Sequence, residues 1–349
     1  DFARIAPMMM PELMDEWFNS SFIRGALSSA GISMINQGPF SAATGLNLLH
    51  QHIYSSGIFF NINFSKGGLV SIADALAQSS QSNGAVIQTE SSVKSILIKN
   101  GVCKGVQLEN GDELLSEKTL SGLDPTQTFI HLIGSNNLDP TMYRQIKNIK
   151  YRGVVSRIHY ALNSLPEIAG VPTDKMNTMF SISPSIEYLE RAYDASKYGQ
   201  ISKNPYIIFN IPTVNDSTFA EKGKHVLSAT IQYTPYHLRD SSWTDKTKKS
   251  LTENVTKIIE QYIPNFSSCI ESSVLFSPID LEKKLGMTEG SINHGELTLD
   301  QFFFMRPTIA LSKYGTPFKN LFLCGPSTHP GSGPNGSSGY NAAMEVLRN

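Results

Sequence analysis

The residues from Asn320 to Leu347 carry the pattern in this 349-residue chain that is best suited to chemistry. Asn320 to Cys324 is a compact apolar run that predicts a strand, and Tyr340 to Leu347 predicts a helix. The fifteen residues between them, Gly325 to Gly339, include five glycines. Such a turn can lie against a ligand, with N–H groups at the helix start facing an anion or a carbonyl. A flexible Gly/Ser tail is disfavoured because a strand and an apolar helix bracket the segment.

Three glycines of this turn, Gly331, Gly333 and Gly336, match the spacing G-x-G-x-x-G. That fingerprint requires a βαβ unit of about 30 residues and an acidic residue about 20 positions later. The chain ends thirteen residues after Gly336, and Pro334 lies inside the turn. We therefore reject a Rossmann interpretation of these glycines.

Candidate groups for proton transfer lie in and near the same region. His294 and Arg306 flank an aromatic block, and His329 lies in the turn, so each is a candidate catalytic residue. Each could equally be a hydrogen-bonded structural residue. His50 and His52 are two residues apart on a predicted helix, which points them in different directions, and no metal site is predicted.

Composition excludes several classes of function. The 29 basic and 30 acidic residues give a net charge of -1, and no block of Lys or Arg exceeds two, so nucleic acid is not expected as a partner. A charged fraction of 17% is below the usual ~25% and indicates much internal surface or an apolar cavity. The three cysteines form no C-x-x-C pair and are expected to be reduced.

Neither a membrane-spanning run of about 18 apolar residues nor a signal peptide is recognisable. We expect a soluble protein of the cytoplasm, or of the mitochondrial matrix if the source is eukaryotic. An amphipathic helix is predicted from Pro11 to Ala30, with Trp17 and Phe22 on its apolar face. We expect burial of this face, with peripheral membrane contact as the alternative.

Further elements are predicted upstream of the turn. Residues 46–54 predict a helix, and Lys66-Gly67-Gly68 precedes another that runs to residue 76, where glycine permits a close approach to a neighbouring group. Runs at 85–89, 93–98 and 103–108 predict a three-stranded meander, because Asn100-Gly101 and Asn110-Gly111 are strong hairpin signals. A further strand is expected at 118–120, before an Asp124-Pro125 turn.

The pattern changes after Gln127. A helix at 128–133, strands at 154–162, 206–211 and 225–233, and a helix from Asp245 to Tyr262 are predicted. Leu251, Val255, Ile258, Ile259 and Tyr262 mark the buried stripe of that last helix. Long strands with a covering helix suggest a second domain with a mixed sheet.

Three segments resemble a known family. NLFLCGPSTHPGSGPNGSSGYNAA resembles the C-terminal flavin-contacting signature of the phytoene desaturase-like flavoproteins, a branch of the amine oxidase-type FAD superfamily. SKGGLVSIADALAQSSQSNGAVIQTESSVKSILIKNGVCKGVQLENGDEL resembles the central stretch of that family. SINHGELTLDQFFFMRP resembles its penultimate block, most like the mitochondrial pyridine nucleotide-disulphide oxidoreductase domain-containing proteins and their bacterial relatives. The resemblance is specific in 46–125 and 291–344.

The resemblance implies an α/β chain of α+β mixed type, in which an incomplete amine oxidase-type FAD-binding domain accompanies a mixed-sheet substrate domain. Residues 1–61 would be a helical cap and 62–125 the central part of the FAD-binding domain. Residues 126–290 would form the substrate domain, and 291–349 the flavin-contacting part.

The resemblance also implies FAD as cofactor and removal of a hydride from a hydrophobic small molecule onto flavin N5. The implied cofactor-binding residues are Val93, Gly325, Pro326, Ser327, Thr328, Gly331, Gly333, Gly336, Ser338, Gly339 and Tyr340. Gly67, Gly68 and Phe304 would lie near the substrate. The residues that could line an apolar cavity, or equally pack in a core, are Trp17, Phe18, Phe22, Phe59, Phe60, Phe302, Phe303, Phe304 and Met305.

One feature of the family has no counterpart. Its members begin with a strand, a G-x-G-x-x-G turn and a helix that hold the FAD pyrophosphate, and this chain supplies none of them. We interpret the chain as a fragment of a longer enzyme, excised or proteolysed and inactive alone. The alternative is a non-catalytic binding or scaffold protein on a degenerate flavoprotein fold.

Overall fold

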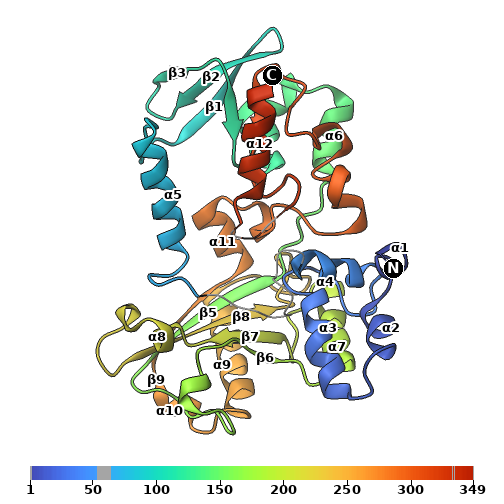
Figure 1. The fold of residues 1–349 in the computed structure, drawn as a ribbon, viewed down its shortest axis with the longest axis vertical. Helices are drawn as coiled ribbons and strands as arrows, with labels where there is room; N and C mark the ends of the chain where they lie inside the picture. The colour runs from blue at the N-terminus through green and yellow to red at the C-terminus, as the bar shows by residue number, and fades with distance from the viewer. Residues whose placement is uncertain (1, 53–63, 332, 334, 349) are drawn as a thin grey trace. The chain divides into compact units, whose positions relative to one another are not determined.

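A computed structural model describes residues 2–52, 64–331, 333 and 335–348, which fall into two compact units (Figure 1). Unit 1 comprises Asp1–Leu76 and Gly153–Leu281, and unit 2 comprises Ala77–Arg152 and Glu282–Asn349. The division at 61, 125 and 290 stays a prediction. Residues 126–152 belong by their contacts to unit 2, together with residues 77–125.

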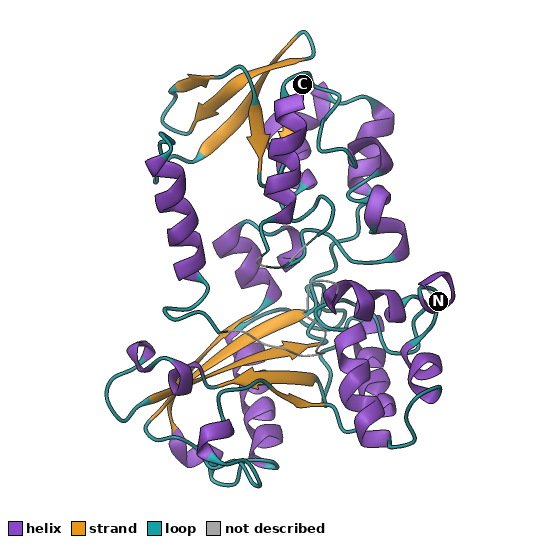
Figure 2. Cartoon of the chain, in the orientation of Figure 1, coloured by secondary structure: helices purple, strands orange, loops and turns teal. Residues whose placement is uncertain are grey.

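Unit 1 contains a five-stranded sheet in the order β6-β7-β8-β5-β9 (Figure 2). The bounds are Val155–Leu162 for β5, Phe180–Ile182 for β6, Tyr206–Asn210 for β7, His225–Gln232 for β8 and Ile270–Phe276 for β9. Three of these strands match the predicted runs. All four pairings are antiparallel, so this sheet is not of mixed direction as expected. Parallel strands must be joined by a long crossover connection, usually a helix, whereas antiparallel strands can be joined without one.

Helix α9, Asp245–Glu260, packs on one face of this sheet. Its predicted stripe is confirmed for Leu251, Val255, Ile258 and Ile259, which are buried against β5, β7 and β8. Tyr262 lies beyond the helix and is exposed, so its place in the stripe was wrong.

The predicted amphipathic helix at 11–30 is two helices, α2 (Met10–Asp15) and α3 (Ser21–Gly31). The Ser20 side chain accepts a hydrogen bond from the N–H of Ile23, which starts a new helix. Leu13 and Met14 are buried as expected. Trp17 and Phe22 are about 70% exposed, so the expected burial is wrong for these two.

Unit 2 contains the meander β1 (Val93–Lys99), β2 (Val102–Leu108) and β3 (Glu113–Leu115). The hairpins at Asn100-Gly101 and Asn110-Gly111 are confirmed. Residues 85–89 form no strand, because they follow helix α5 (Val70–Ser82) as an exposed segment with no pairing partner among the described residues. The third strand is 113–115.

A second small sheet in unit 2 pairs β4 (Thr119–Ser121) with β10 (Leu321–Leu323) in parallel. The π-helix η1, Thr126–Gly134, follows β4, and α12, Ser337–Arg348, follows the glycine-rich turn after β10. Phe129, Ile146, Leu321 and Leu323 belong to the core beneath these elements. The strand and helix predicted around the turn are therefore confirmed.

The remaining α-helices among the described residues are α1 Phe2–Ile5, α4 Thr44–His52, α5 Val70–Ser82, α6 Pro140–Lys147, α7 Ile186–Lys197, α8 Pro212–Asn215, α10 Phe266–Cys269 and α11 Pro278–Leu285. Among the described residues, no helix is long and apolar enough to cross a bilayer, and no cluster of three metal-ligating side chains occurs.

Candidate functional site

The glycine-rich turn of unit 2 starts where the two parallel strands end. The N–H of Cys324 donates to the carbonyl of Ser121, 2.9 Å away. A Cβ at Gly325 would clash with the carbonyl oxygen of Gly122. Glycine at 325 is thus required by backbone packing between β10 and the end of β4. This reason is sufficient without a ligand at that position.

A buried carboxylate fixes the chain after β4. Asp124 Oδ1 accepts from the N–H of Gln127 at 3.0 Å and from the phenol of Tyr151 at 3.2 Å. Its Oδ2 accepts from the N–H of Thr288 at 3.2 Å. Burial and the Asp124 charge raise the pKa of the Tyr151 phenol. Asp124 therefore joins the start of η1 to residue 288.

Arg306 connects the segment 293–301 to the turn. It is 2% exposed, and every partner is a backbone carbonyl. Its Nε and Nη2 donate to Pro326 O at 3.2 and 2.9 Å, and Nη1 donates to Glu296 O at 3.0 Å. Asn293, Gly295 and Gln301 supply the other carbonyls. Burial lowers the pKa of Arg306 to about 10, so it stays charged at neutral pH. Its contacts make it a positioning residue.

The two candidate histidines are both partly buried. His294 has a φ of +52°, and its Nδ1 is buried without a hydrogen-bond partner among the described residues. Burial lowers the pKa of His294; the charge of Asp124 raises it and that of Arg306 lowers it. Burial, followed by the Arg306 charge, lowers the pKa of His329. Both rings are thus neutral near pH 7 and can accept a hydrogen bond.

The Ser327 hydroxyl shares this unpartnered state. Its side chain is 0% exposed, and its Oγ has no hydrogen-bond partner among the described residues. Thr328 differs, because its Oγ1 donates to Gly325 O at 2.8 Å. Buried polar atoms in proteins nearly always have partners. The orphaned Ser327 Oγ and His294 Nδ1 therefore fit a polar group that a bound cofactor would present.

The start of α12 is open. Asn335 Oδ1 accepts from the N–H of Ser337, and Ser338 is buried with its Oγ 3.4 Å from Gly331 O. A Cβ at Gly339 would meet nothing within 4 Å, and no described residue accepts a hydrogen bond from its N–H. The first turn of α12 thus has room for a ligand against its backbone.

Three other glycines of the turn have backbone conformations that favour glycine. Gly331, Gly333 and Gly336 have φ values of +110°, +116° and +67°, a region that favours glycine. A Cβ at Gly331 would also lie 3.5 Å from Arg306 Nε. Ser332 and Pro334 lie outside the described residues.

The remaining predicted site residues are dispersed. Val93 starts β1 and is half-buried, and Tyr340 and Phe304 are exposed in unit 2. Gly67 and Gly68 are in unit 1: the N–H of Gly67 donates to the Asp216 carboxylate at 2.6 Å, and Gly68 lies beside the Phe219 ring. Of the aromatic residues considered for a cavity, Phe302 is buried, Phe18, Phe303 and Met305 are half-buried, and Phe59 and Phe60 lie outside the described residues.

Sequence reasoning missed Asp124, Tyr151 and Gly122 as site-organising residues. The Asp124-Pro125 pair offered a signal, because Asp before a helical run is a common cap. No local signal marks Tyr151 or Gly122, since their partners are far along the chain.

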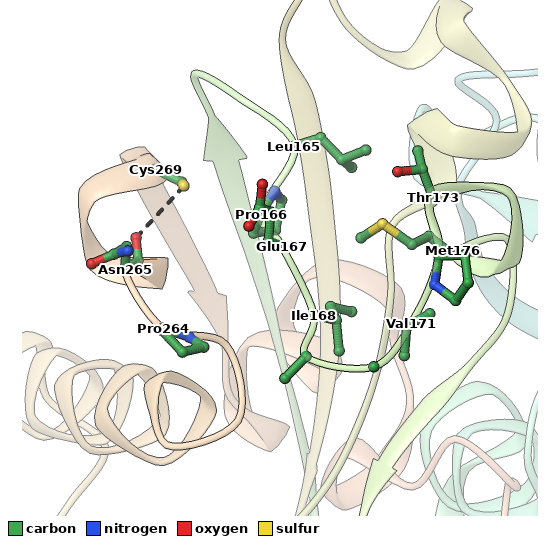
Figure 3. A pocket seen from close by; sticks show the side chains of 13 residues that line it. Leu165, Pro166, Glu167, Ile168, Val171, Thr173, Met176, Pro264, Asn265 and Cys269 are labelled. Atoms are coloured by element: carbon green, nitrogen blue, oxygen red, sulfur yellow. Dashed lines mark hydrogen bonds between the residues drawn. The ribbon is translucent and has the colours of Figure 1, made fainter.

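Unit 1 contains a cavity of about 640 Å³ that holds none of the predicted site residues (Figure 3). Leu165, Ile168, Val171 and Met176 line it from one loop, and Cys269 lies across from them beside Asn265. The Cys269 thiol donates to the Asn265 carbonyl at 3.6 Å, and its sulfur accepts a hydrogen bond from the Ser164 hydroxyl at 3.5 Å. We assign no chemistry to this thiol.

No family model matches the chain. Its homologues include pyridine nucleotide-disulfide oxidoreductase domain-containing protein 2 of Rattus norvegicus, 32% identical over 97% of this chain and 60% of the relative. Phytoene desaturase (neurosporene-forming) of Cereibacter sphaeroides is 24% identical over 82% of the chain and 54% of the relative. The chain spans about 60% of the first of these relatives. These are the homologues that the sequence motifs indicated.

Solved structures show the same fold. An oxidoreductase from Methanosarcina mazei matches with a TM-score of 0.62 at 16% identity, covering 99% of this chain and 69% of the other. Cyclohexylamine oxidase from Brevibacterium oxydans matches with a TM-score of 0.55 at 10% identity, covering 99% and 69%. This chain therefore has the fold of these two proteins.

Proposed function

We propose that this chain, a homologue of oxidoreductases and desaturases, forms the flavin-ring end of an FAD-dependent dehydrogenase or desaturase. The observation that supports this most concerns the glycine-rich turn of unit 2. Ser327, which follows β10, has a buried Oγ without a hydrogen-bond partner among the described residues, and the first turn of α12, at the other end of the turn, has room for a ligand. The homologues and the fold support the oxidoreductase class.

The residues of the turn would hold the flavin. When bound, FAD supplies an acceptor for a hydride. The N–H of Gly339 would donate to it, and the positive end of α12 would stabilise negative charge by roughly 0.3 to 2 kcal/mol. Ser327 would donate its free hydroxyl, and neutral His294 would accept or hold a proton at Nδ1. Arg306 would keep the segment 293–301 against Pro326.

Two surfaces support cooperation with a further nucleotide-binding segment. The parallel β4–β10 pair has two strands, and parallel sheets are normally larger and covered on both faces. Tyr340, Met344 and Leu347 form a stripe on α12 and are 67%, 38% and 80% exposed. We propose that a βα segment carrying the pyrophosphate site covers these surfaces. The chain alone is then expected to be inactive.

The flavin absorbance of the intact protein tests the proposal, with Gly339→Ala as the informative variant. Its methyl group would enter open space at a helical position, so stability should hold or rise by about 0.5 to 1 kcal/mol. A flavin against this backbone would be displaced, so affinity for FAD should fall about tenfold. Ala343→Ser on the same helix is the matched control and should change neither quantity.

Intact protein that stays colourless after addition of FAD would overturn the oxidoreductase proposal and favour the scaffold alternative. Equal FAD affinity of Gly339→Ala and the unsubstituted protein would overturn the placement at α12. Ser327→Ala provides a second readout: its stability should be unchanged because the hydroxyl has no partner, while FAD affinity should fall.

A further inference from the structure

One face of the unit 1 sheet carries a strip of basic and polar side chains. On β5, Ile158, Tyr160 and Leu162 are buried in the core that includes α9. Successive side chains on a strand alternate between faces, so Arg157 and His159 lie on the opposite face. Both are only partly buried there.

The register defines their neighbours. Arg157 pairs with Thr230 of β8 and with Phe276 of β9. His159 pairs with Ser228 of β8 and with Val274 of β9. The sheet thus places two basic side chains in the middle, with hydroxyl groups on one side and apolar side chains on the other. We call these six residues the Arg157 strip.

The charge of Arg157 has no partner among the residues that the structure describes. No hydrogen bond or ion pair joins its guanidinium to any of them. Burial lowers its pKa, and no carboxylate acts on it. The other described arginines that are partly or fully buried differ: Arg24 is paired with Asp15, and Arg306 is surrounded by carbonyls. Arginine is seldom buried without an anionic or carbonyl partner.

His159 is the second basic residue of the Arg157 strip, and it also lacks an acidic neighbour among the described residues. Burial lowers its pKa, followed by the charge of Arg157. Its ring packs edge-on against Phe276 with centroids 6.1 Å apart. No acidic side chain acts on His159 either, so the strip has net positive potential and hydrogen-bond donors without an internal anion.

We propose that the Arg157 strip binds the carboxylate of a small amphipathic molecule. A guanidinium fork matches a carboxylate in a two-bond arrangement, and the hydroxyls of Thr230 and Ser228 can donate to the same oxygens. The hydrocarbon part would lie on Phe276 and Val274, which is 47% exposed. A single guanidinium beside a neutral histidine suits one negative charge. The strip lies wholly in unit 1, so this site does not depend on the proposed flavin chemistry.

Calorimetric titration of the intact protein with octanoate, octanol and octyl phosphate tests the site. Octanoate should bind about tenfold more tightly than octanol, which has the same chain without the charge. Arg157→Gln should weaken octanoate about tenfold and leave octanol unchanged. Arg157→Lys should lie between, because it keeps the charge and loses the fork. Lys224→Gln, an exposed lysine already paired with Glu271, is the control and should match the unsubstituted protein.

Several results would overturn the proposal: no octanoate binding, equal binding of octanoate and octanol, or octanoate binding unaffected by Arg157→Gln. Tighter binding of octyl phosphate would overturn the carboxylate assignment. Circular dichroism checks that each variant is folded. If Arg157→Gln fails to fold, Thr230→Val removes a hydroxyl at constant shape and should weaken octanoate several-fold, about the value of one hydrogen bond to a charged group.

Discussion

Replacing Arg306 by methionine should destabilise unit 2 by about 3 kcal/mol. The substitution removes six hydrogen bonds to five carbonyls. Hydrogen bonds that share one side chain are not additive, so we assign each a contribution of about 1 kcal/mol to the free energy of unfolding. Against this, the buried charge is removed. Its unfavourable burial lowers the pKa to about 10, which corresponds to about 3 kcal/mol. The net loss is then about 6 minus about 3 kcal/mol, because methionine fills similar space but offers no donor.

Urea unfolding measures this loss, and amide hydrogen exchange locates it. Because Arg306 and its five carbonyl partners all belong to unit 2, exchange should accelerate in residues 293–301 and 325–331 and stay unchanged in unit 1. Arg144→Met is the matched control, since Arg144 is exposed on α6, and should change stability by no more than about 0.5 kcal/mol.

A loss in Arg306→Met as small as that of the control would refute the reasoning. It would mean that water or rearranged backbone satisfies the five carbonyls without cost. Accelerated exchange confined to unit 1 would equally contradict the assignment of Arg306 as the link between the segment 293–301 and Pro326.

Three further predictions concern the same fold. Asp124→Asn should lower the urea unfolding free energy by about 1 to 3 kcal/mol, since an amide donor would face the N–H of Thr288; an unchanged value would contradict this. Gly325→Ala should lower the thermal midpoint, because its methyl would clash with Gly122; a midpoint equal to that of the parent protein would argue against a tight β4–β10 junction. Burial raises the pKa of Tyr160 to about 12, whereas a tyrosine in the unfolded chain ionises near about pH 10. The free energy of unfolding should therefore be highest below about pH 10 and should fall as the pH rises from about 10 to about 12, because the unfolded chain loses its proton first. Tyr160→Phe should reduce that fall by up to about 3 kcal/mol in urea titrations at several pH values, and an identical pH profile would contradict the linkage.

Local patterns were sufficient for many elements. Apolar periodicity located α9 and its stripe, and the two Asn-Gly pairs located the hairpins, because the turn conformation depends on the residues in the turn itself. The strand, glycine-rich turn and helix at the C-terminus were likewise readable. Residues 85–89 misled the prediction, since β propensity alone does not supply a neighbouring strand.

The sequence by itself determined many of the elements, the resemblance to flavin-dependent oxidoreductases and the turn that could meet a cofactor, because each depends on residues close together in the chain. The tertiary structure decided the roles of individual residues. Arg306 binds backbone carbonyls, Gly325 is required by the close approach of Gly122, and Arg157 lacks a partner in the described part of the chain. Each of these facts depends on groups brought together from distant parts of the chain, and burial and pairing at that distance leave no local pattern.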